Sequence, residues 1–352
     1  MHAQGTIAAI EPFPNCPALD GCHCVTSSLA KIYHHAGHPL PEEMLLGLGA
    51  GMGFIYWQMK MGGESFVFVG GRGNIQNFYQ DLGARTGVGI REVHTASAKK
   101  AESELLRLLA EKTPVMLGGD MGLLPWFEFP ADYHFGGHTF VVCGYDGHDT
   151  MLASDIDQHA SGVKPGLCAP ITREQLSGVR NSPFKPFPPK NLRLEFDFSG
   201  FRAPGKEEIA ASIRQTIDAH LNPPIRNFGV SGIRHTADQI LKWPAQFKDR
   251  DLRMNLFNLY IFIEIGGTGG GCFRSMYAQF LLQAAKITGN AAMVGSAATF
   301  QESALKFSSI ARIFQDAARM GEVEAKIATA SAIFREIADL EEEAYGLLGG
   351  QV

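Results

Sequence analysis

Residues 20–38, DGCHCVTSSLAKIYHHAGH, place two cysteines at or just before the start of a predicted helix. Apolar residues recur at helical spacing and predict a helix over 24–36, which Gly37 ends: Val25, Leu29, Ile32 and Tyr33. The N–H groups and the dipole at a helix N-terminus favour a thiolate, so a cysteine here is a candidate nucleophile. Cys24 lies nearer the start of the periodicity than Cys22, although a free cysteine is also commonly an inert buried thiol.

A histidine and an aspartate follow in a predicted β-hairpin. The segment FGGHTFVVCGYDG (135–147) contains a strand that begins at His138, and TMLASD (150–155) returns as its partner and ends at Asp155. Neighbouring strands can hold a carboxylate against an imidazole, which is the orienting arrangement of a Cys-His-Asp triad. A core histidine and a turn-capping aspartate are the plainer interpretations, and Asp157 is a rival for the carboxylate.

The remaining pattern predicts an α+β chain of two domains. Before residue 181, helical patterns at 41–48 and 98–112 alternate with strand-like runs at 66–71 and 114–120. The proline-rich and aromatic stretch 181–204 predicts a boundary between domains 1–195 and 196–352. Beyond it, six segments have helical spacing and predict an all-α C-terminal domain: 207–221, 235–247, 254–265, 275–289, 299–320 and 323–348.

Composition excludes several classes of protein. The chain has 352 residues, of which 45% are hydrophobic and 19% charged, which excludes a disordered chain. Its formal net charge of −5 argues against a nucleic-acid binder. No apolar run is long enough for a transmembrane helix, and the first residues lack the features of a signal peptide, so we expect a cytoplasmic protein. Six cysteines are too few for a disulfide scaffold.

Segments across nearly the whole chain carry a resemblance to a known family. They are GCHCVTSSL (21–29), GLGAGMGFIYW (47–57), LPWFEF (124–129), FGGHTFVVCGYDG (135–147) and EIGGTGGGCFRSMYAQFLLQAA (264–285). In these segments the chain resembles the BtrH-like family of butirosin biosynthesis, within the papain-like (C39-like) cysteine peptidase superfamily. The resemblance implies a papain-like N-terminal domain followed by a helical domain. It also implies acyl transfer from a carrier-protein thioester to an amine by a Cys24-His138-Asp155 triad.

The sequence leaves the oxyanion donor and the substrate contacts open. Papain-like enzymes usually have an oxyanion-hole glutamine about six residues before the nucleophile, where this chain has Ala18. Asn15 and Asp20 are nearby polar alternatives, and backbone N–H groups at the helix start are another. Further candidates for substrate or oxyanion contacts are Cys22, His23, Trp57 and Trp126.

A glycine-rich segment in the second half is a further candidate site. In GGTGGGCFRS (266–275), glycines precede a predicted helix with Arg274 in its first turn, which is an arrangement that can hold a phosphate or a phosphopantetheine. Tyr277 flanks the segment and is a candidate pocket residue. A tight turn between two helices is the alternative interpretation.

No metal site is predicted, because Cys16, Cys22, His23 and Cys24 lack a second ligand pair at a usual spacing. No resident cofactor is predicted either, and phosphopantetheine enters only as part of an acyl-carrier substrate. The expected partners are an acyl-carrier protein or another acyl thioester and an amine acceptor. The apolar helix at 254–265 leaves a homodimer open.

Three other functions remain open from the residues alone. The first is a hydrolase with the same triad, which would cleave an amide, a peptide or a thioester. The second is a thiol-dependent isomerase or cyclase. The third is a non-catalytic binding protein, which the presence of all three triad residues argues against.

Overall fold

The chain forms two compact units in the computed structural model, which describes residues 19–61, 64–158, 162–185, 187–320, 322–350 and 352. The first unit comprises residues up to 42 and 87–201, and the second comprises 43–86 and 202–352. This division differs from the predicted single boundary between 195 and 196. The segment 43–86 belongs with the C-terminal half because it packs there, and a linear reading of the sequence cannot detect such packing.

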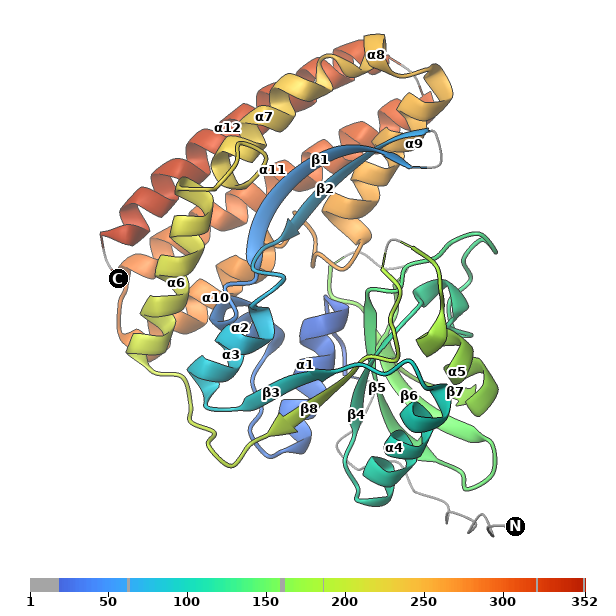
Figure 1. Ribbon diagram of the computed structural model, residues 1–352. Coiled ribbons are helices and arrows are strands. Elements are labelled where there is room, and N and C mark those ends of the chain that lie inside the picture. The colour runs from blue at the N-terminus through green and yellow to red at the C-terminus, as the bar shows by residue number, and fades with distance from the viewer. Residues whose placement is uncertain (1–18, 62–63, 159–161, 186, 321, 351) are drawn as a thin grey trace. The chain divides into compact units, whose positions relative to one another are not determined.

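A six-stranded antiparallel sheet forms the centre of the first unit (Figure 1). Its strand order is β3-β8-β4-β5-β6-β7. The strands are β3 (Gly89–Val93), β4 (Val115–Gly119), β5 (His138–Tyr145), β6 (Thr150–Ile156), β7 (Gly166–Thr172) and β8 (Arg193–Asp197). The predicted hairpin of β5 and β6 is confirmed, with Val141 opposite Ser154 and an irregularity after Val142. Every residue of β5 is buried, so this strand lies in the core of the sheet.

Three α-helices pack around this sheet. Helix α1 (Cys24–His35) contacts β4, β5 and β6 through a buried face that includes Leu29, Ile32 and Tyr33. Helices α4 (Ala98–Ala110) and α5 (Arg173–Asn181) contact β4 and each other. The helix predicted over 24–36 is therefore confirmed, and its apolar spacing fixes which side of it faces the core.

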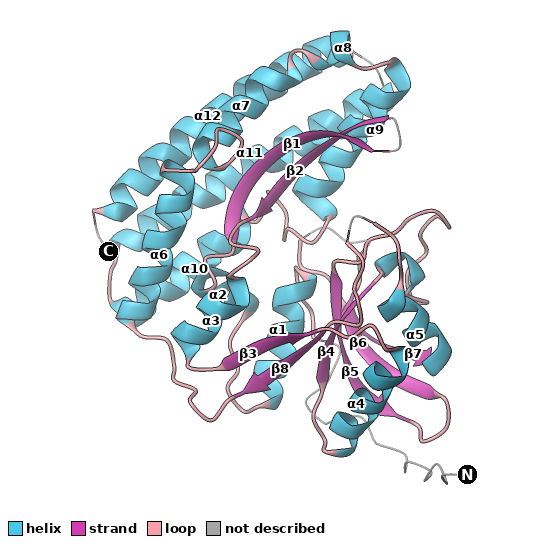
Figure 2. Ribbon diagram, in the orientation of Figure 1, coloured by secondary structure: helices cyan, strands magenta, loops and turns pink. Residues whose placement is uncertain are grey.

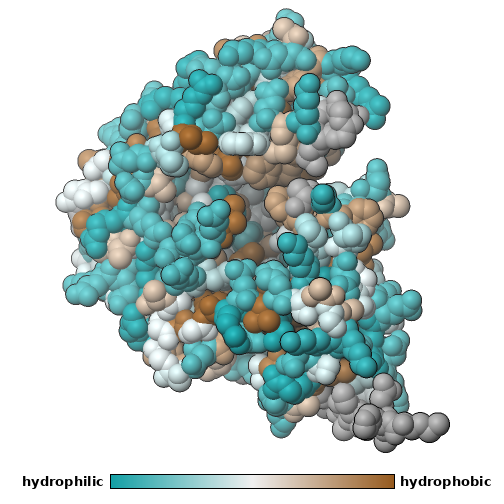
Figure 3. Space-filling view, in the orientation of Figure 1, coloured by the Kyte–Doolittle hydropathy of each residue, from teal (hydrophilic) through white to brown (hydrophobic). Residues whose placement is uncertain are grey.

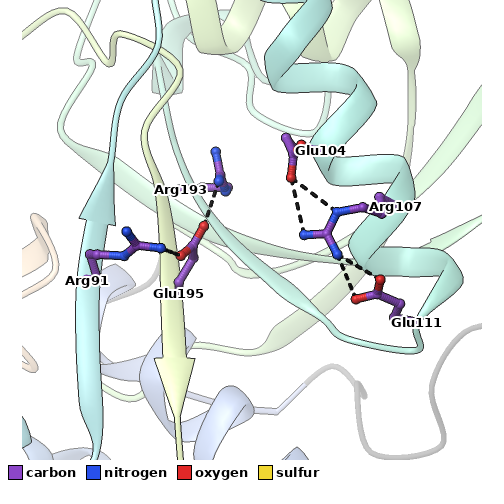
Figure 4. Close-up of polar contacts among 6 residues, drawn as sticks. All are labelled: Arg91, Glu104, Arg107, Glu111, Arg193 and Glu195. Carbon is purple, nitrogen blue, oxygen red and sulfur yellow. Dashed lines mark hydrogen bonds and ion pairs between the residues drawn. The ribbon is translucent and has the colours of Figure 1, made fainter.

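Ion pairs on the surface of the first unit link side chains that the fold already brings close (Figure 4). Arg91 on β3 lies opposite Glu195 on β8 and pairs with it, and Glu195 also accepts a bond from Arg193 at 2.6 Å. Arg107 on α4 pairs with acids one turn before and after it, Glu104 and Glu111. Exposed pairs of this kind contribute about 0–1 kcal/mol each, so they support the register without determining it.

Among the described residues, the second unit combines nine α-helices with one β-hairpin, so the helical domain also contains strands that the sequence did not predict there (Figure 2). The hairpin consists of β1 (Met52–Met61) and β2 (Glu64–Arg72). Its two outer edges are covered by hydrogen bonds from the helical part. On β1, Tyr56 and Asn227 exchange bonds of 3.0 and 2.9 Å, and on β2 the Asn255 side chain accepts from the Val67 N–H at 2.9 Å. Covered edges explain how a sheet of only two strands is stable here.

The helices of the second unit include both early and late segments of the chain. The early ones are the short α2 (Glu42–Leu48), which begins at the last residue of the first unit, and α3 (Phe78–Thr86). The late ones are α6 (Lys206–Leu221), α7 (Gly229–Ile240), α8 (Trp243–Gln246), α9 (Asp249–Tyr260), α10 (Arg274–Thr288), α11 (Ala292–Met320) and α12 (Val323–Gly349). A π-helical turn, Ile261–Ile265, extends α9. Five of the six helical segments predicted after residue 204 are confirmed with shifted ends, whereas 235–247 covers the end of α7, a turn at 241–242 and the separate helix α8.

The surface is ordinary for a globular chain. On the face in Figure 3, hydrophilic side chains prevail, and hydrophobic ones are exposed in small groups. In the described part of the chain, none of the helices has both the length and the apolar character needed to cross a bilayer.

Candidate active site

The predicted nucleophile begins α1. Cys24 is the first residue of the helix and is partly exposed. His23 precedes it in an extended conformation (φ −130°, ψ 132°), and its ring Nδ1 accepts the Thr26 N–H at 3.4 Å. Its carbonyl accepts the Ser27 N–H at 2.8 Å. His23, a candidate for substrate contact, therefore caps the helix and fixes the direction in which Cys24 leaves the backbone.

A carboxylate holds the turn before Cys24 in place. Glu42 is buried and accepts the Cys22 N–H at 2.6 Å and the His23 N–H at 3.4 Å. It also accepts the Thr26 hydroxyl at 3.0 Å. The turn that carries the nucleophile is thus bonded both to its own helix and to a residue about 20 positions further along.

His138 connects the thiol to a carboxylate. It is the first residue of β5 and is 1% exposed. Its Nε2 lies 2.7 Å from Oδ2 of Asp155 on β6. Its ring also forms a hydrogen bond with the Cys24 thiol. Asp155 engages Nε2, which leaves Nδ1 as the ring nitrogen available to the thiol. The three predicted triad residues are therefore joined in one chain of hydrogen bonds.

Asp155 is held by four contacts, so its orientation is fixed. Oδ2 accepts the Trp126 indole N–H at 3.1 Å in addition to the His138 ring. Oδ1 accepts the Ile156 N–H at 2.8 Å, and the Asp155 carbonyl accepts Lys31 Nζ at 3.0 Å. Trp126 was a candidate for the substrate wall, and in the structure its N–H is bonded to the triad carboxylate. The rival Asp157 has no recorded bond to His138 within the described residues.

The triad is electrostatically poised as a thiolate and an imidazolium. Burial opposes ionisation of Cys24, but the hydrogen bond and the charge of His138 outweigh it and lower the pKa of the thiol. Burial likewise disfavours the charged imidazole, yet the charge of Asp155 and its hydrogen bond raise the pKa of His138. The lowered thiol pKa and the raised imidazole pKa both favour the form of the pair in which the proton lies on His138.

A buried lysine lies close to this pair. Lys164 is 1% exposed, and its backbone bonds to Gly21 in both directions, at 2.9 and 2.6 Å. Its Nζ donates to Gln158 Oε1 at 3.2 Å. Burial lowers the pKa of Lys164, while the nearby thiols Cys24 and Cys22 act in the opposite direction. The bridge to Gly21 therefore brings a cationic side chain to the turn that carries the nucleophile.

A tyrosine also lies within electrostatic range of the thiol. Burial together with the charges of Asp120 and Cys24 raises the pKa of Tyr133 to about 12, so its hydroxyl stays protonated. The ring of Tyr133 stacks on Phe129 with centroids 4.5 Å apart. The loop that carries it is held by Asp120, which accepts the Phe135 N–H at 2.9 Å and bonds to the His134 ring at 2.9 Å. This loop therefore carries a protonated hydroxyl within electrostatic range of Cys24.

Three predicted site residues, Arg274, Tyr277 and Trp57, belong to the second unit, whereas the triad belongs to the first. Arg274 is fully buried, and its guanidinium bonds to both carboxylate oxygens of Glu341 at 2.8 and 3.0 Å. It also donates to the carbonyls of Gly53 at 2.6 Å and Cys272 at 2.9 Å. The phosphate-binding role considered for Arg274 is therefore wrong, because its donors are used inside the protein.

The neighbouring candidates are also structural. Tyr277 is fully buried and packs edge-on against Phe300, so it lines no pocket. The glycine-rich segment forms the turn between α9 and α10, where a Cβ on Gly271 would lie 2.6 Å from the Ala304 backbone. The turn interpretation is thus the correct one. Trp57 is exposed on β1, and Asn15 lies outside the described residues.

The sequence analysis did not predict several contacts of the site. Lys31 lies seven residues after Cys24 on the same helix face, which is an unusual position for a lysine on a buried stripe and a signal that could have been used. The sequence contains no such signal for Glu42, Lys164 and Tyr133, because only the tertiary structure brings them near the turn that carries Cys24. Among the described residues, no three His, Cys, Asp or Glu side chains gather as a metal site.

Two family models match the chain. The model described as Butirosin biosynthesis protein H, N-terminal, matches residues 23–155. Residues 23–155 therefore form a BtrH-like N-terminal domain. The match begins beside Cys24 and ends at Asp155, so it encloses the whole triad. A second model, Domain of unknown function (DUF4872), matches residues 174–348 and spans α5 to α12. No curated protein matches the chain.

Proposed function

We propose that this protein is a biosynthetic acyltransferase with a papain-like catalytic domain and a Cys24 nucleophile. The observation that carries the proposal is the bonded chain from Cys24 through His138 to Asp155, which ends in a partly exposed thiol of lowered pKa. A hydroxyl nucleophile would need a base at every step, whereas a preformed thiolate attacks acyl carbon directly. The match to a butirosin biosynthesis protein supports a role in making a specialised metabolite.

In the first half-reaction, the Cys24 thiolate attacks the carbonyl carbon of an acyl thioester. The tetrahedral intermediate collapses, the bond to the pantetheine sulfur breaks, and the leaving thiolate takes the proton from His138. Asp155 keeps the imidazole in the tautomer and orientation that this transfer needs, through the 2.7 Å bond to Nε2. The products are a Cys24 acyl-enzyme and a free pantetheine thiol.

In the second half-reaction, an amine attacks the acyl-enzyme. The now neutral His138 accepts the proton that the amine loses, and the C–S bond to Cys24 breaks to restore the thiolate. The products are an amide and the free enzyme. Water in place of the amine would give a free acid, which is the hydrolase alternative with the same residues.

The oxyanion of each intermediate needs donors beside Cys24. The first-turn N–H groups of a helix have no intrahelical partners, and those of Thr26 and Ser27 are already bonded to His23. We assign the Cys24 N–H as one donor. We assign the Lys164 ammonium as the cation that stabilises the negative charge in place of the absent glutamine.

Intact-protein mass spectrometry tests the proposal. The protein is mixed with a panel of acyl-pantetheine thioesters, and the mass is measured for the natural chain, Cys24→Ala and Cys22→Ala. We expect an acyl adduct in the natural chain and in Cys22→Ala, and none in Cys24→Ala. Cys22→Ala is the matched control because it removes a thiol two residues away that has no recorded bond to His138 within the described residues. An adduct that persists in Cys24→Ala would refute the assignment of the nucleophile.

Added amines then separate transfer from hydrolysis. Loss of the adduct with formation of an amide supports the transferase, and release of a free acid at the same rate with and without amines supports the hydrolase. An adduct that rearranges without an acceptor supports the isomerase or cyclase. No adduct with any donor, together with slow alkylation of Cys24 at about pH 6, would favour a binding protein.

A further inference from the structure

The second unit contains a surface cavity that the proposed reaction does not use. Its volume is about 520 Å³, which is within the range of small-molecule sites. It lies where the outer edge of β1 meets the loop before α7 and one face of α7. The residues that line it are Tyr56, Trp57, Gln58, Ile225, Arg226, Asn227, His235 and Gln239. All eight belong to the second unit.

The floor of this cavity is rigid. Tyr56 and Asn227 are joined by two hydrogen bonds, from the Tyr56 N–H at 3.0 Å and from the Asn227 side chain at 2.9 Å. The Tyr56 hydroxyl donates to Gln58 Oε1 at 3.2 Å and accepts the indole N–H of the fully buried Trp243 at 3.4 Å. A floor fixed by its own bonds requires little ordering when a ligand binds.

Apolar surface is exposed at the rim. Trp57 is 39% exposed and Ile225 is 43% exposed, although both are large hydrophobic side chains. The chain has three tryptophans, and the other two are used elsewhere, Trp126 on Asp155 and Trp243 in the core. An exposed indole beside a cavity offers a flat face on which a planar ring can stack.

The positive charge of the cavity comes from Arg226. Arg226 is exposed, and its guanidinium has no recorded hydrogen bond or ion pair among the described residues. Burial and the charges of Arg226 and Lys242 lower the pKa of His235, which indicates a positive field at this ring. The nearby acid that opposes them, Asp238, is paired with Arg335 at 2.5 Å.

We propose that this cavity binds a small organic anion that carries a flat ring, with the ring against Trp57 and the anionic group at Arg226. A guanidinium binds a phosphate or a carboxylate through paired N–H groups, and His235 and Gln239, one turn apart on α7, supply further donors. The site goes beyond the proposed acyl transfer, because none of its lining residues belongs to the triad.

Isothermal titration with two aromatic phosphates tests this inference. The probes are adenosine 5′-monophosphate and 1-naphthyl phosphate, and their neutral or ring-free counterparts are adenosine and inorganic phosphate. We expect both aromatic phosphates to bind and both counterparts to bind at least about tenfold more weakly. Quenching of tryptophan fluorescence by the bound ring should disappear in Trp57→Phe.

Two arginine variants test whether Arg226 binds the anionic group of the ligand. Arg226→Gln should weaken binding of both aromatic phosphates about tenfold and leave adenosine unaffected. Arg214→Gln is the matched control, since Arg214 is an exposed arginine of the same unit that does not line the cavity. Cys24→Ala should bind the probes as tightly as the natural chain does. A failure of the proposed acyl transfer and a failure of ligand binding in this cavity can therefore be told apart.

Three outcomes would overturn the inference. One is no binding of either aromatic phosphate up to about 5 mM, which corresponds to an affinity too weak for a specific site. The second is equal binding of adenosine and its monophosphate. The third is binding that neither Arg226→Gln nor Trp57→Phe weakens relative to Arg214→Gln.

Discussion

Replacing Asp155 by asparagine removes one charge from the triad and keeps its shape. In the natural chain, Oδ2 lies 2.7 Å from Nε2 of His138 and also accepts the indole N–H of Trp126 at 3.1 Å. An asparagine oxygen in place of Oδ2 can accept the same two bonds, so the imidazole and the indole keep their positions, whereas the amide nitrogen in place of Oδ1 loses the bond from the Ile156 N–H. What changes is the stability of the imidazolium, and with it the ionisation of Cys24.

The size of the effect follows from the distance and the burial of the two groups. Two unit charges about 4 Å apart attract by about 4 kcal/mol at an effective dielectric constant of 20. Asp155 is 2% exposed and His138 is 1% exposed, so solvent screens this attraction little. Because one pKa unit corresponds to about 1.4 kcal/mol, the substitution lowers the pKa of His138 by about 3 units.

The effect on the thiol follows from this shift. The pKa of His138 is raised to about 10, so a fall of about 3 units leaves its ring neutral above about pH 7, and Cys24 there loses the charge that lowers its pKa. At about pH 8, an ordinary cysteine with a pKa of 9.0 is ionised in about one molecule in ten. The rate of Cys24 alkylation by iodoacetamide at about pH 8 should therefore fall up to about tenfold in Asp155→Asn.

The assay measures alkylation of Cys24 by peptide mass spectrometry across pH, with circular dichroism to verify folding. Cys168 serves as an internal reference, because it is exposed and its hydrogen bond with Cys143 raises the pKa of its thiol. Asp157→Asn is the matched control, since it removes the same charge two residues away and should change the rate less than about threefold. A folded Asp155→Asn protein that retains the natural rate, or an equal loss in Asp157→Asn, would refute the triad.

Three further substitutions have definite expected outcomes. Trp126→Phe removes one hydrogen bond to the Asp155 carboxylate and should slow acyl-adduct formation about three- to tenfold, as read by intact mass. Lys164→Met removes a cation beside Cys24, so the pH profile of Cys24 alkylation should move to higher pH; a shift to lower pH would contradict the charge assigned to Lys164. Arg274→Met leaves a buried carboxylate unpaired and should lower the free energy of unfolding by about 3–5 kcal/mol in urea, whereas acyl-adduct formation by folded protein should be retained.

The sequence predicted the local parts of the site because they depend on short-range patterns. The 3.6-residue spacing from Val25 to Tyr33 places Cys24 at a helix start, and alternating apolar residues with a Gly-containing turn place His138 and Asp155 on a hairpin. Because the two strands are adjacent, a histidine on one strand and a carboxylate on the other lie at or close to hydrogen-bonding distance. For this reason the sequence was enough to predict a carboxylate near His138, whereas the structure was needed to decide between Asp155 and Asp157.

The division of the chain into two units could not be predicted from the sequence, because it depends on long-range packing. Residues 52–61 form a strand whose outer edge bonds to Asn227, and β2 bonds to Asn255, about 190 positions away. No local pattern records such a pairing. Arg274 was misjudged for the same reason: a glycine-rich helix start with an arginine is compatible with a phosphate site, and only Glu341 on α12 decides against it.

Glu42 links the catalytic turn to this long-range organisation. It is the last residue of the first unit before the chain leaves for residues 43–86, and its carboxylate accepts the N–H groups of Cys22 and His23. The two backbone amides just before the nucleophile therefore already donate hydrogen bonds within the protein. Since those of Thr26 and Ser27 are bonded to His23, the amides of Cys24 and Val25 are the first-turn donors without a described partner. We therefore propose that the nucleophile's own amide holds the oxyanion, and that Lys164, from outside the helix, supplies the charge that compensates for the alanine at position 18.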